Sequence, residues 1–400
     1  MRVLSLFDGM ACGMLAFQAA GIKVSRYVAF EKDPYAVKTS SHNFPMIEHR
    51  GDVFEADFTE FLGFDFAIGG SPCTFWSIAQ KNNRETEPSG MGWELFSQFV
   101  RAIKEAKPMF FVYENNKSMS KAIRESITQT FGFEPICINS SSVSAQNRQR
   151  LYWVGNRNPD GTYSRVHVDQ PEDKGLLLRD VLDGMTNKES CVPVRIPEYG
   201  IEDKARPLGA NYSNNCGGFE HRMFSEKPNK QQVDMVATPV RVGLYPNENG
   251  VAEDHQQNRV YSIDGKSINL CGNGGGMGAK TGLYAIPIEF SDDIPVKAIS
   301  CADGKTYSVY LVKDGMITIK GKQYPIKLAD GYYIIRKLTV SECKRLQTVP
   351  EWYAFPVSDT QAYKMLGNGW TVEVIAHLLK ATQAGIQAEE QLSLFGKGVI

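Results

Sequence analysis

The chain has 400 residues, of which 42% are hydrophobic, and its formal net charge is −1. This length predicts two or three domains, and the balanced charge excludes a globally basic surface, so contacts with nucleic acid would depend on local basic patches. The sequence has no run of 18 apolar residues and begins directly with a predicted strand, so we expect neither a membrane span nor export. Its eight cysteines are scattered without Cys-x-x-Cys or zinc-ligand spacing, which favours reduced thiols and a cytoplasmic location.

The first predicted unit is a strand, a glycine turn and a helix. Residues 2–7 form an apolar strand pattern, residues 8–13 carry glycines at positions 9 and 13, and Gly21 ends the helical pattern that follows. Glycines allow the backbone to approach a ligand closely, as in nucleotide-binding turns. The Gly-x-x-x-Gly spacing differs from the dinucleotide motif Gly-x-Gly-x-x-Gly, which disfavours a nicotinamide cofactor.

Acidic residues follow the next two predicted strands. Glu31 ends the strand predicted over residues 24–30, about 20 residues after the glycine turn, where an acid suits hydrogen bonding to a ribose. Asp52 lies in the sequence Gly51-Asp52-Val53 and is short enough to read an adenine edge. Each acid alone is better interpreted as a solvated loop end. Polar or glycine turns after three successive strands together favour a nucleoside pocket.

Cys73 follows the fourth predicted strand, residues 64–68, in the sequence Gly69-Gly70-Ser71-Pro72-Cys73. Ligands of open α/β sheets bind at the carboxyl ends of strands, and Pro72 stiffens the turn that carries the thiol. The cysteine is therefore a candidate nucleophile, although most free cysteines act as small buried hydrophobes. Residues 74–93 form a predicted loop of a length that is usually functional.

Further charged residues follow the next strands. The strand predicted over residues 109–113 ends in Glu114, and a predicted helix (120–130) and strand (135–140) lead to Gln146-Asn147-Arg148-Gln149-Arg150. On an extended chain Arg148 and Arg150 point to one side, which suits a phosphate or a carboxylate. In isolation a solvated surface pair is the alternative.

The alternation of strands and helices stops near Asn156. Residues 156–335 combine Gly- and Asn-rich turns with short β-prone runs, which predicts a separate, mostly irregular and β domain. Residues 314–346 carry seven basic residues against three acidic ones, a balance suited to a phosphate backbone. Thr339 and Glu342 have capping-box spacing, and a last helix is predicted from near Thr371. Basic and amide side chains, which are the types that read base edges and phosphates, recur in this region: Arg206, Arg222, Lys227, Lys230, Arg241, Gln256, Gln257, Asn258, Arg259, Lys266 and Lys280.

These motifs, in this order, resemble those of the DNA (cytosine-5) methyltransferases over about residues 1–155 and 336–380. The first and last motifs are similar to the eukaryotic de novo branch, and the middle is similar to phage and bacterial members. Ser5 stands where the family often has an acid, and Asp8 is a candidate to take its place. The matching segments are Leu6-Phe7-Asp8-Gly9 with Gly13, Glu31, Asp52-Val53, Gly70-Ser71-Pro72-Cys73, Glu114-Asn115, Gln146 with Arg148 and Arg150, Arg336 to Pro350, and Leu366-Gly367-Asn368.

The resemblance implies an α/β fold, with a Rossmann-like S-adenosylmethionine-dependent methyltransferase domain and a smaller irregular/β target-recognition domain. It implies a catalytic and cofactor-binding domain at 1–155, a target-recognition domain at 156–335, a closing segment at 336–384 whose last helix returns to the first domain, and a loose tail at 385–400. S-adenosylmethionine is the implied cofactor and double-stranded DNA the implied substrate, with a monomer expected. The implied cofactor-binding residues are Phe7, Asp8, Gly9, Gly13, Glu31, Lys32, Asp52, Val53, Pro72, Asn368 and Trp370.

The resemblance also implies a mechanism. Cys73 would add to C6 of a cytosine that has left the base stack, so that C5 attacks the methyl group. Glu114 would hold the Watson–Crick edge and protonate N3, and Arg150 with Arg148 would hold the base's O2 and the backbone. The candidate DNA-binding residues are Ser77, Arg84, Gln146, Arg259 and Arg336.

Two other functions compete with this one. The first is a tRNA cytosine-5 methyltransferase, against which the large region 156–335 favours duplex DNA. The second is a non-catalytic DNA-binding protein, which the intact Cys73, Glu114, Arg148 and Arg150 disfavour. Near the end of the chain, the pentapeptide Gln391, Leu392, Ser393, Leu394 and Phe395 resembles a bacterial sliding-clamp-binding motif; a tail segment that packs on its own protein is the alternative.

Overall fold

The computed structural model describes residues 1–78, 84–183, 191–193, 238–272, 278, 280–288, 298–301 and 305–383. The chain divides into two compact units. The first contains Met1–Val143, Arg148–Lys174 and the chain from Gln347 onward, and the second contains Ser144–Asn147 and Gly175–Leu346.

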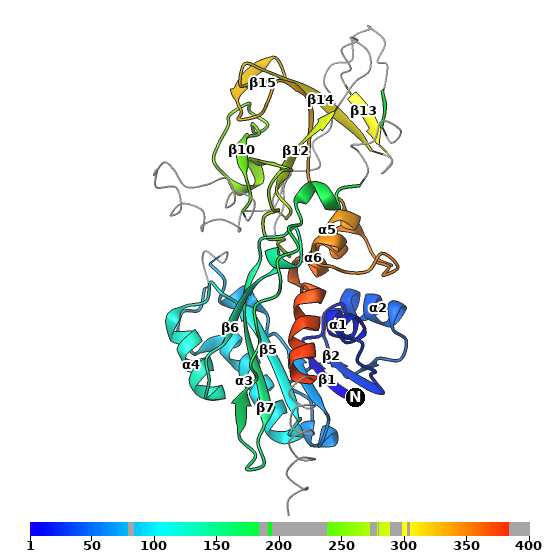
Figure 1. Cartoon of the computed structure of the whole chain (residues 1–400), viewed down its shortest axis with the longest axis vertical. Helices are drawn as coiled ribbons and strands as arrows, with labels where there is room; N and C mark the ends of the chain where they lie inside the picture. The colour runs from blue at the N-terminus through cyan, green and yellow to red at the C-terminus, as the bar shows by residue number, and fades with distance from the viewer. Residues whose placement is uncertain are drawn as a thin grey trace, which may run out of the picture. The chain divides into compact units, whose positions relative to one another are not determined.

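The first unit is an α/β domain (Figure 1). A helix over residues 372–383 follows its last labelled element. In chain order its elements are β1 (Arg2–Leu6), α1 (Cys12–Ala20), β2 (Arg26–Phe30), α2 (Pro34–Asn43), β3 (Glu48–His49), η1 (Phe58–Phe61), β4 (Phe66–Gly69), η2 (Cys73–Phe75), α3 (Gly90–Ala106), β5 (Phe110–Asn116), α4 (Lys121–Phe131), β6 (Ile136–Asn139), η3 (Ser140–Ser142), β7 (Gln149–Arg157), β8 (Tyr163–Arg165) and α6 (Asp359–Asn368).

The strands of this unit form one sheet in the order β3-β2-β1-β4-β5-β7-β6, with β8 paired to β7. The first five strands pair in parallel, whereas β7 runs antiparallel to both β5 and β6. Because the carboxyl ends of parallel strands meet at one edge, the segments that follow β1, β2, β4 and β5 converge there. The segments after β1, β2 and β4 carry the glycine turn, Glu31 and Cys73, and Glu114 lies within β5, two residues before its carboxyl end.

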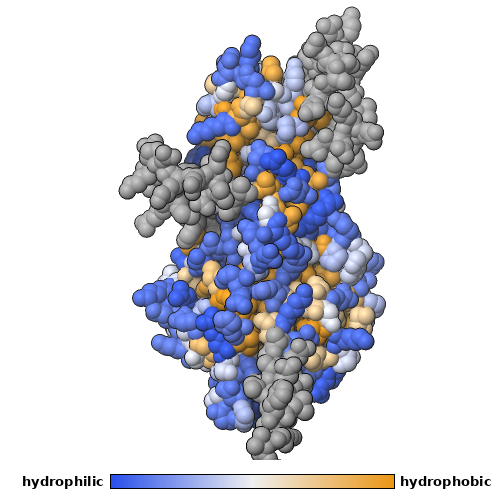
Figure 2. Space-filling model, in the orientation of Figure 1, coloured by the Kyte–Doolittle hydropathy of each residue, from blue (hydrophilic) through white to orange (hydrophobic). Residues whose placement is uncertain are grey.

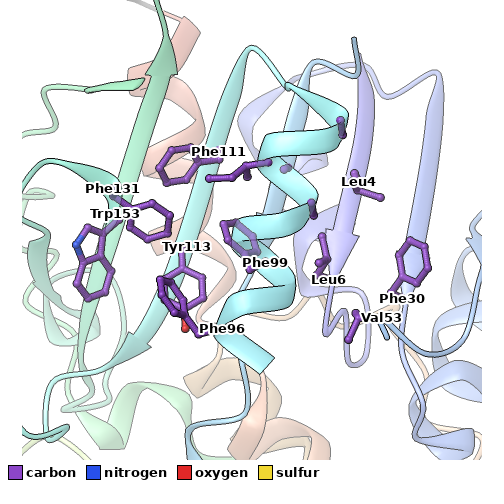
Figure 3. Close-up of a cluster of buried hydrophobic side chains, with 14 of the residues drawn as sticks. Leu4, Leu6, Phe30, Val53, Phe96, Phe99, Phe111, Tyr113, Phe131 and Trp153 are labelled. Carbon is purple, nitrogen blue, oxygen red and sulfur yellow. The ribbon is translucent and has the colours of Figure 1, made fainter. Parts of the chain in front are cut away.

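Alternation along the strands divides the core of the first unit between the two faces of the sheet. On one face, Phe96 and Phe99 of α3 pack on Tyr113 of β5, with ring centroids 5.2 and 5.0 Å apart (Figure 3). On the other face, Phe17 of α1 packs edge-on against Phe66 of β4, at 5.2 Å. Each such buried ring contributes roughly 1.5–3 kcal/mol through burial alone. Helices thus cover both faces, which holds the strand ends rigidly beneath the site.

Local sequence signals explain the helix ends. The Ser120 side chain accepts a hydrogen bond from the Ile123 amide at 3.2 Å and begins α4, and Gly132 ends that helix in the left-handed conformation. The Thr339–Glu342 capping box is confirmed, because the Glu342 amide donates to Thr339 Oγ1 at 3.1 Å and the Thr339 amide donates to Glu342 Oε2 at 2.7 Å.

The boundaries of the units differ from those expected from the sequence. β8 pairs with β7, and the Val166 amide donates to the Val154 carbonyl, so residues 156–174 belong with the first unit. The segment 336–346 belongs with the second unit, which includes the buried Leu346. Strand pairing, rather than the end of the βα alternation, decides where the first unit stops.

The second unit is mostly β, as expected from the sequence. Its strands pair in the order β10-β11-β12-β17-β14-β13-β9, with the hairpin β15–β16 attached to β14. Its core includes Val260, Leu283, Val312 and Ile317. In chain order the elements are η4 (Leu178–Val181), β9 (Cys191–Pro193), β10 (Arg241–Leu244), η7 (Gln256–Asn258), β11 (Arg259–Ser262), β12 (Leu283–Ile288), β13 (Ala298–Cys301), β14 (Thr306–Lys313), β15 (Met316–Ile319), β16 (Lys322–Pro325), β17 (Gly331–Arg336) and α5 (Val340–Leu346).

Hydrophilic side chains cover most of the visible surface of the described residues, and apolar side chains occupy smaller areas between them (Figure 2). Among the described helices, none combines the length and apolarity that a membrane span requires.

Candidate active site

The thiol of Cys73 lies at the start of a short 3-10 turn directly after β4. The Trp76 and Ser77 amides donate to the Cys73 carbonyl at 3.1 and 2.9 Å, which fixes the backbone that carries the thiol. Burial raises the pKa of the Cys73 thiol above its ordinary value; Arg150 opposes this rise and Glu114 adds to it. The free protein therefore holds a protonated thiol at neutral pH, among charged groups that respond to its ionisation.

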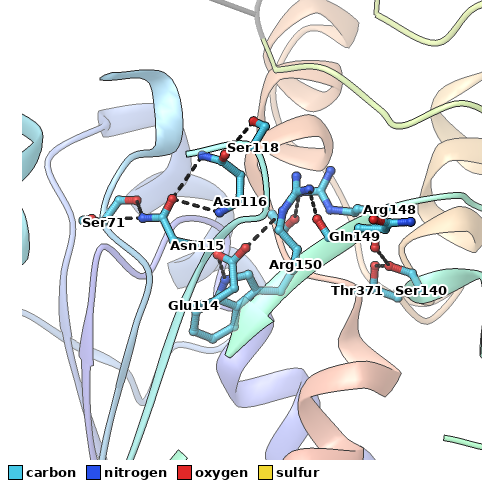
Figure 4. A network of polar contacts seen from close by, with 12 residues as sticks. Ser71, Glu114, Asn115, Asn116, Ser118, Ser140, Arg148, Gln149, Arg150 and Thr371 are labelled. Carbon is cyan, nitrogen blue, oxygen red and sulfur yellow. Dashed lines mark hydrogen bonds and ion pairs between the residues drawn. The ribbon is translucent and has the colours of Figure 1, made fainter. Parts of the chain in front are cut away.

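A buried network supports the turn that carries Cys73 (Figure 4). The Asn115 side chain, which is fully buried, donates to the Ser71 carbonyl at 3.2 Å. The Ser71 hydroxyl pairs with the Tyr113 hydroxyl at 2.7 Å. β5 thus holds the Ser-Pro-Cys segment through its side chains as well as through strand pairing with β4.

The carboxylate of Glu114 is held by Arg150. The Arg150 Nε lies 3.0 Å from Glu114 Oε1, and both side chains are nearly buried, at 12% and 11% exposure (Figure 4). The antiparallel register between β5 and β7 pairs Asn116 with Arg150, which sets the guanidinium diagonally across from Glu114. Such a charge-assisted contact in a dry environment orients the carboxylate strongly.

The second oxygen of Glu114 accepts a hydrogen bond that the sequence did not predict. The indole Nε1 of Trp370 donates to Glu114 Oε2 at 3.0 Å. The sequence did contain one signal, because an indole N–H that is removed from water usually finds a hydrogen-bond partner. That signal could not identify the partner, which lies 256 residues away.

Arg148 contacts backbone carbonyls at the end of α6 and just after it. It is 4% exposed and donates to the carbonyls of Gly367 at 3.1 Å and Gly369 at 2.8 Å. Burial, followed by repulsion from Arg150, lowers the pKa of Arg148 to about 10, so the guanidinium stays charged at neutral pH. The two arginines therefore do not share one target: Arg150 holds Glu114, and Arg148 holds the loop that follows α6.

The loop after β2 holds Glu31 against the opening glycine turn and Lys32 against Asp52. Glu31 Oε2 accepts from the Gly9 amide at 2.8 Å, and Oε1 accepts from the Lys32 and Asp33 amides at 2.9 and 2.8 Å. Lys32 Nζ pairs with Asp52 at 2.7 Å, which lowers the pKa of that carboxyl. The structure thus brings together four predicted cofactor-binding residues, Gly9, Glu31, Lys32 and Asp52. Gly9 has a left-handed backbone conformation, with φ +58°.

The carboxylate of Asp8 lies beside the Ser5 side chain. Ser5 Oγ and Tyr27 OH both donate to Asp8 Oδ1 at 2.6 Å. Burial raises the pKa of Asp8 to about 6, against the effect of these hydrogen bonds, and Glu31 adds to the rise. Asp8 Oδ2 is buried and has no hydrogen-bond partner in the described residues. An orphaned carboxylate oxygen beside the glycine turn fits a donor group from a bound ligand.

The remaining predicted cofactor-binding residues differ in conformation and exposure. Phe7 has φ +57° in the opening turn. A Cβ at Gly13 would lie 2.6 Å from the Tyr27 hydroxyl, so a glycine is needed there. Val53 is buried, and Pro72 and Asn368 are exposed.

The predicted DNA-binding residues separate into different environments. Arg336 is 3% exposed and makes a bidentate ion pair with Glu342, at 2.8 and 2.6 Å. This ion pair places the guanidinium in the interior of the second unit, and a contact of Arg336 with DNA stays a prediction from the sequence. Arg259 is likewise 9% exposed, with its Nε 2.7 Å from Asp254 Oδ1, so it too belongs to the framework.

The other three candidates also make internal contacts or are buried. Arg84 donates to the carbonyls of Trp76 at 3.2 Å and Ser118 at 2.7 Å, and so fastens the chain after Cys73 to the segment after β5. Ser77 donates its amide to Cys73. Gln146 is fully buried in the second unit, with both amide atoms lacking partners among the described residues.

Comparison with known proteins supplies the family. The C-5 cytosine-specific DNA methylase family model matches residues 1–384, and the chain belongs to this family. An orphan methyltransferase, M.SPRI, of Bacillus phage SPR is 25% identical over 95% of this chain and 97% of its own length. The type II methyltransferase M.HhaI of Haemophilus parahaemolyticus is 23% identical over 94% of this chain and 93% of its own length.

Solved structures share the fold. The S. pombe Dnmt2 methyltransferase matches with a TM-score of 0.54 at 14% identity, covering 96% of this chain and 99% of its own. The Entamoeba histolytica methyltransferase EhMeth matches with a TM-score of 0.56 at 12% identity, covering 96% and 98%. The predicted family, the Rossmann-like methyltransferase fold, the enzyme class and the use of S-adenosylmethionine are thereby confirmed.

Proposed function

We propose that this DNA cytosine-5 methyltransferase acts on a cytosine flipped out of duplex DNA, through a covalent bond between Cys73 and C6 of the base. The observation that carries the proposal is the grouping of Cys73, Glu114 and Arg150 at one edge of the sheet, where their charges act on one another. A thiol in that position needs access to the face of the pyrimidine ring, which a stacked base does not offer.

The residues divide the chemistry between them. As Cys73 adds to C6, its thiol proton leaves and electron density moves through the ring toward N3 and C5. Glu114 stabilises that density by donating a proton to N3, and Arg150 orients the carboxyl group and the base's O2. S-adenosylmethionine, when bound, would supply an electrophilic methyl group for C5 and would leave as S-adenosylhomocysteine. Removal of the C5 proton by a base, with return of the N3 proton to Glu114, then expels the Cys73 thiolate and restores the aromatic ring.

The cofactor residues fit this role. The glycine turn lets the backbone approach the ligand, Glu31 suits the ribose hydroxyls, and Asp52 suits the adenine edge. The Oδ2 atom of Asp8, which has no hydrogen-bond partner in the described residues, could accept a hydrogen bond from the cofactor in the same turn. These placements support the cofactor assignments made from the sequence.

A mechanism-based substrate tests the proposal. The protein is incubated with S-adenosylmethionine and either duplex DNA that contains 5-fluorocytosine or a matched tRNA, and covalent adducts are separated under denaturing conditions. We expect an adduct with DNA that is absent for Cys73→Ser, with S-adenosylhomocysteine binding retained in the variant. No adduct with DNA, an adduct with tRNA alone, or an adduct that survives Cys73→Ser would contradict the proposal.

The sliding-clamp contact remains a prediction from the sequence, since residues 391–395 lie outside the described part of the chain. Deletion of residues 388–400 is expected to abolish binding to a bacterial sliding clamp in calorimetry. Unchanged affinity would refute this contact without bearing on methyl transfer.

A further inference from the structure

Two donors from different parts of the chain hold the two oxygens of Glu114. Arg150 Nε lies 3.0 Å from Oε1, and Trp370 Nε1 lies 3.0 Å from Oε2. The terminal torsion of a glutamate is broad and intrinsically loose. One donor on each oxygen removes that freedom and fixes the plane of the carboxyl group.

The approach of Trp370 to Glu114 depends on Gly70. A Cβ at Gly70 would lie 2.8 Å from Glu114 Oε2 and 3.3 Å from Trp370 Nε1. The glycine before the Ser-Pro-Cys turn therefore leaves room for this hydrogen bond. The nucleophile turn, the end of β5 and the loop after α6 converge on one carboxylate oxygen.

The backbone on either side of Trp370 is fastened by side chains. Arg148 donates to the carbonyls of Gly367 and Gly369, and Gln347 Nε2 donates to the Leu366 carbonyl at 2.6 Å. The Thr371 hydroxyl donates to Gln347 Oε1 at 2.8 Å. These contacts fix the loop that carries the indole. Arg150 supports Glu114 directly through the ion pair, and Arg148 supports it indirectly by holding this loop.

We propose that Trp370 is a positioning residue for Glu114, in addition to its expected place beside the cofactor. This inference rests on the proposed function. Indole and guanidinium groups donate hydrogen bonds and cannot accept them. A proton on Glu114 can therefore be given to neither Trp370 nor Arg150, and it must point toward a third group, which is N3 of the target base.

The Trp370 indole links the expected cofactor site to the carboxyl group of Glu114. It is only partly buried, so one part of its surface is available to a ligand while its N–H is committed to Glu114. A cofactor that packs on the indole holds the donor in place and thereby holds the carboxyl group that receives the base.

Trp370→Phe tests this role because it removes the N–H and keeps an aromatic ring. Trp352→Phe is the matched control, since Trp352 is 56% exposed. We expect Trp370→Phe to lower kcat and the rate of adduct formation with 5-fluorocytosine DNA by about 10- to 100-fold, or about 1.4–2.7 kcal/mol at 1.36 kcal/mol per tenfold. S-adenosylhomocysteine affinity in calorimetry is expected to change by less than about threefold.

A double-mutant cycle separates positioning from general packing. If Trp370 acts through Glu114, Trp370→Phe lowers the rate of adduct formation by less than about twofold in a Glu114→Gln background. Equal losses in the two backgrounds, or weaker S-adenosylhomocysteine binding with unchanged rates at saturating cofactor, would overturn the inference. Should Trp370→Phe fail to fold, Trp370→His retains a ring N–H, and full loss of activity in a folded Trp370→His protein would also count against it.

The wild-type protein distinguishes this inference from the proposed function. A wild type that forms no adduct with DNA overturns both. A wild type that forms the adduct, with a folded Trp370→Phe variant that forms it equally fast, overturns the positioning role alone.

Discussion

Gly70→Ala offers a sharp test of the geometry around Glu114. The new Cβ would lie 2.8 Å from Glu114 Oε2, 3.0 Å from the Glu114 carbonyl oxygen and 3.3 Å from Trp370 Nε1. Ordinary contact begins at 3.4 Å, so the carboxylate oxygen would have to move by about 0.6 Å. The carbonyl cannot yield as easily, because it belongs to a paired central strand.

The displacement predicts a larger loss of activity than of stability. Overpacking of this kind costs about 1–3 kcal/mol in folding free energy. A movement approaching 1 Å at a catalytic group costs up to roughly 100-fold in rate, so we expect kcat/KM to fall by about 10- to 100-fold. The Trp370–Glu114 hydrogen bond, now at 3.0 Å, would be stretched toward the limit of a useful hydrogen bond.

Gly132→Ala is the matched control. Gly132 has φ +83° and nothing within 4 Å of its missing Cβ, so alanine there costs about 1–2 kcal/mol through backbone strain, away from the carboxylate. Urea unfolding gives the stability of both variants, and single-turnover methyl transfer gives their rates. A Gly70→Ala protein with the rate of the Gly132→Ala control would refute the argument that Gly70 makes room for Glu114.

Three further changes test the buried charges. Arg148→Met is expected to lower the free energy of unfolding by about 1–3 kcal/mol more than Arg150→Met does, because it leaves the buried Gly367 carbonyl without its donor. Urea titration measures both free energies, and the opposite order would indicate that Arg148 serves the substrate alone. Glu342→Gln should cost about 3–5 kcal/mol by stranding the buried Arg336, whereas Glu48→Gln, in a pair with side chains 38% and 39% exposed, should cost under about 1 kcal/mol. Burial raises the pKa of Asp8 from 3.8 to about 6, so the native state binds the Asp8 proton more tightly than the unfolded state does. The stabilisation that protonated Asp8 gives the native state is therefore complete below pH 3.8 and is lost as the pH rises through about 6. Relative to Asp8→Asn, the wild type should lose roughly 3 kcal/mol over that interval, and parallel pH–stability curves for the two proteins would contradict the assignment.

Local signals predicted much of the first unit. The helix predicted over residues 120–130 is observed at Lys121–Phe131, and the strand predicted from the glycine-bounded apolar run is observed at Phe66–Gly69. These elements depend on residues within a few positions of one another. The site strands were predictable for the same reason, because Glu31 and Cys73 come directly after recognisable strands and Glu114 lies near the end of another.

The partners of the charged groups were not predictable in this way. Arg148 and Arg150 have the same chemistry and point to the same side of an extended chain, and only packing against the loop 219 residues later gives them different targets. Arg336 carries the residue type of a phosphate contact, but its place at the end of β17 buries it beside Glu342. Residue type sets what a side chain can bind, and burial decides what it does bind.

Glu114 shows why the motifs act as one unit. Its oxygens are held from β7 and from the loop after α6, and its approach to both is permitted by a glycine in the turn that carries Cys73. A change in any of these segments reaches the carboxyl group through contacts of about 3 Å, whatever the distance along the chain. The nucleophile turn, the base-binding carboxylate and the loop expected to border the cofactor therefore have to be positioned together, so defects in one should appear kinetically as defects in the others.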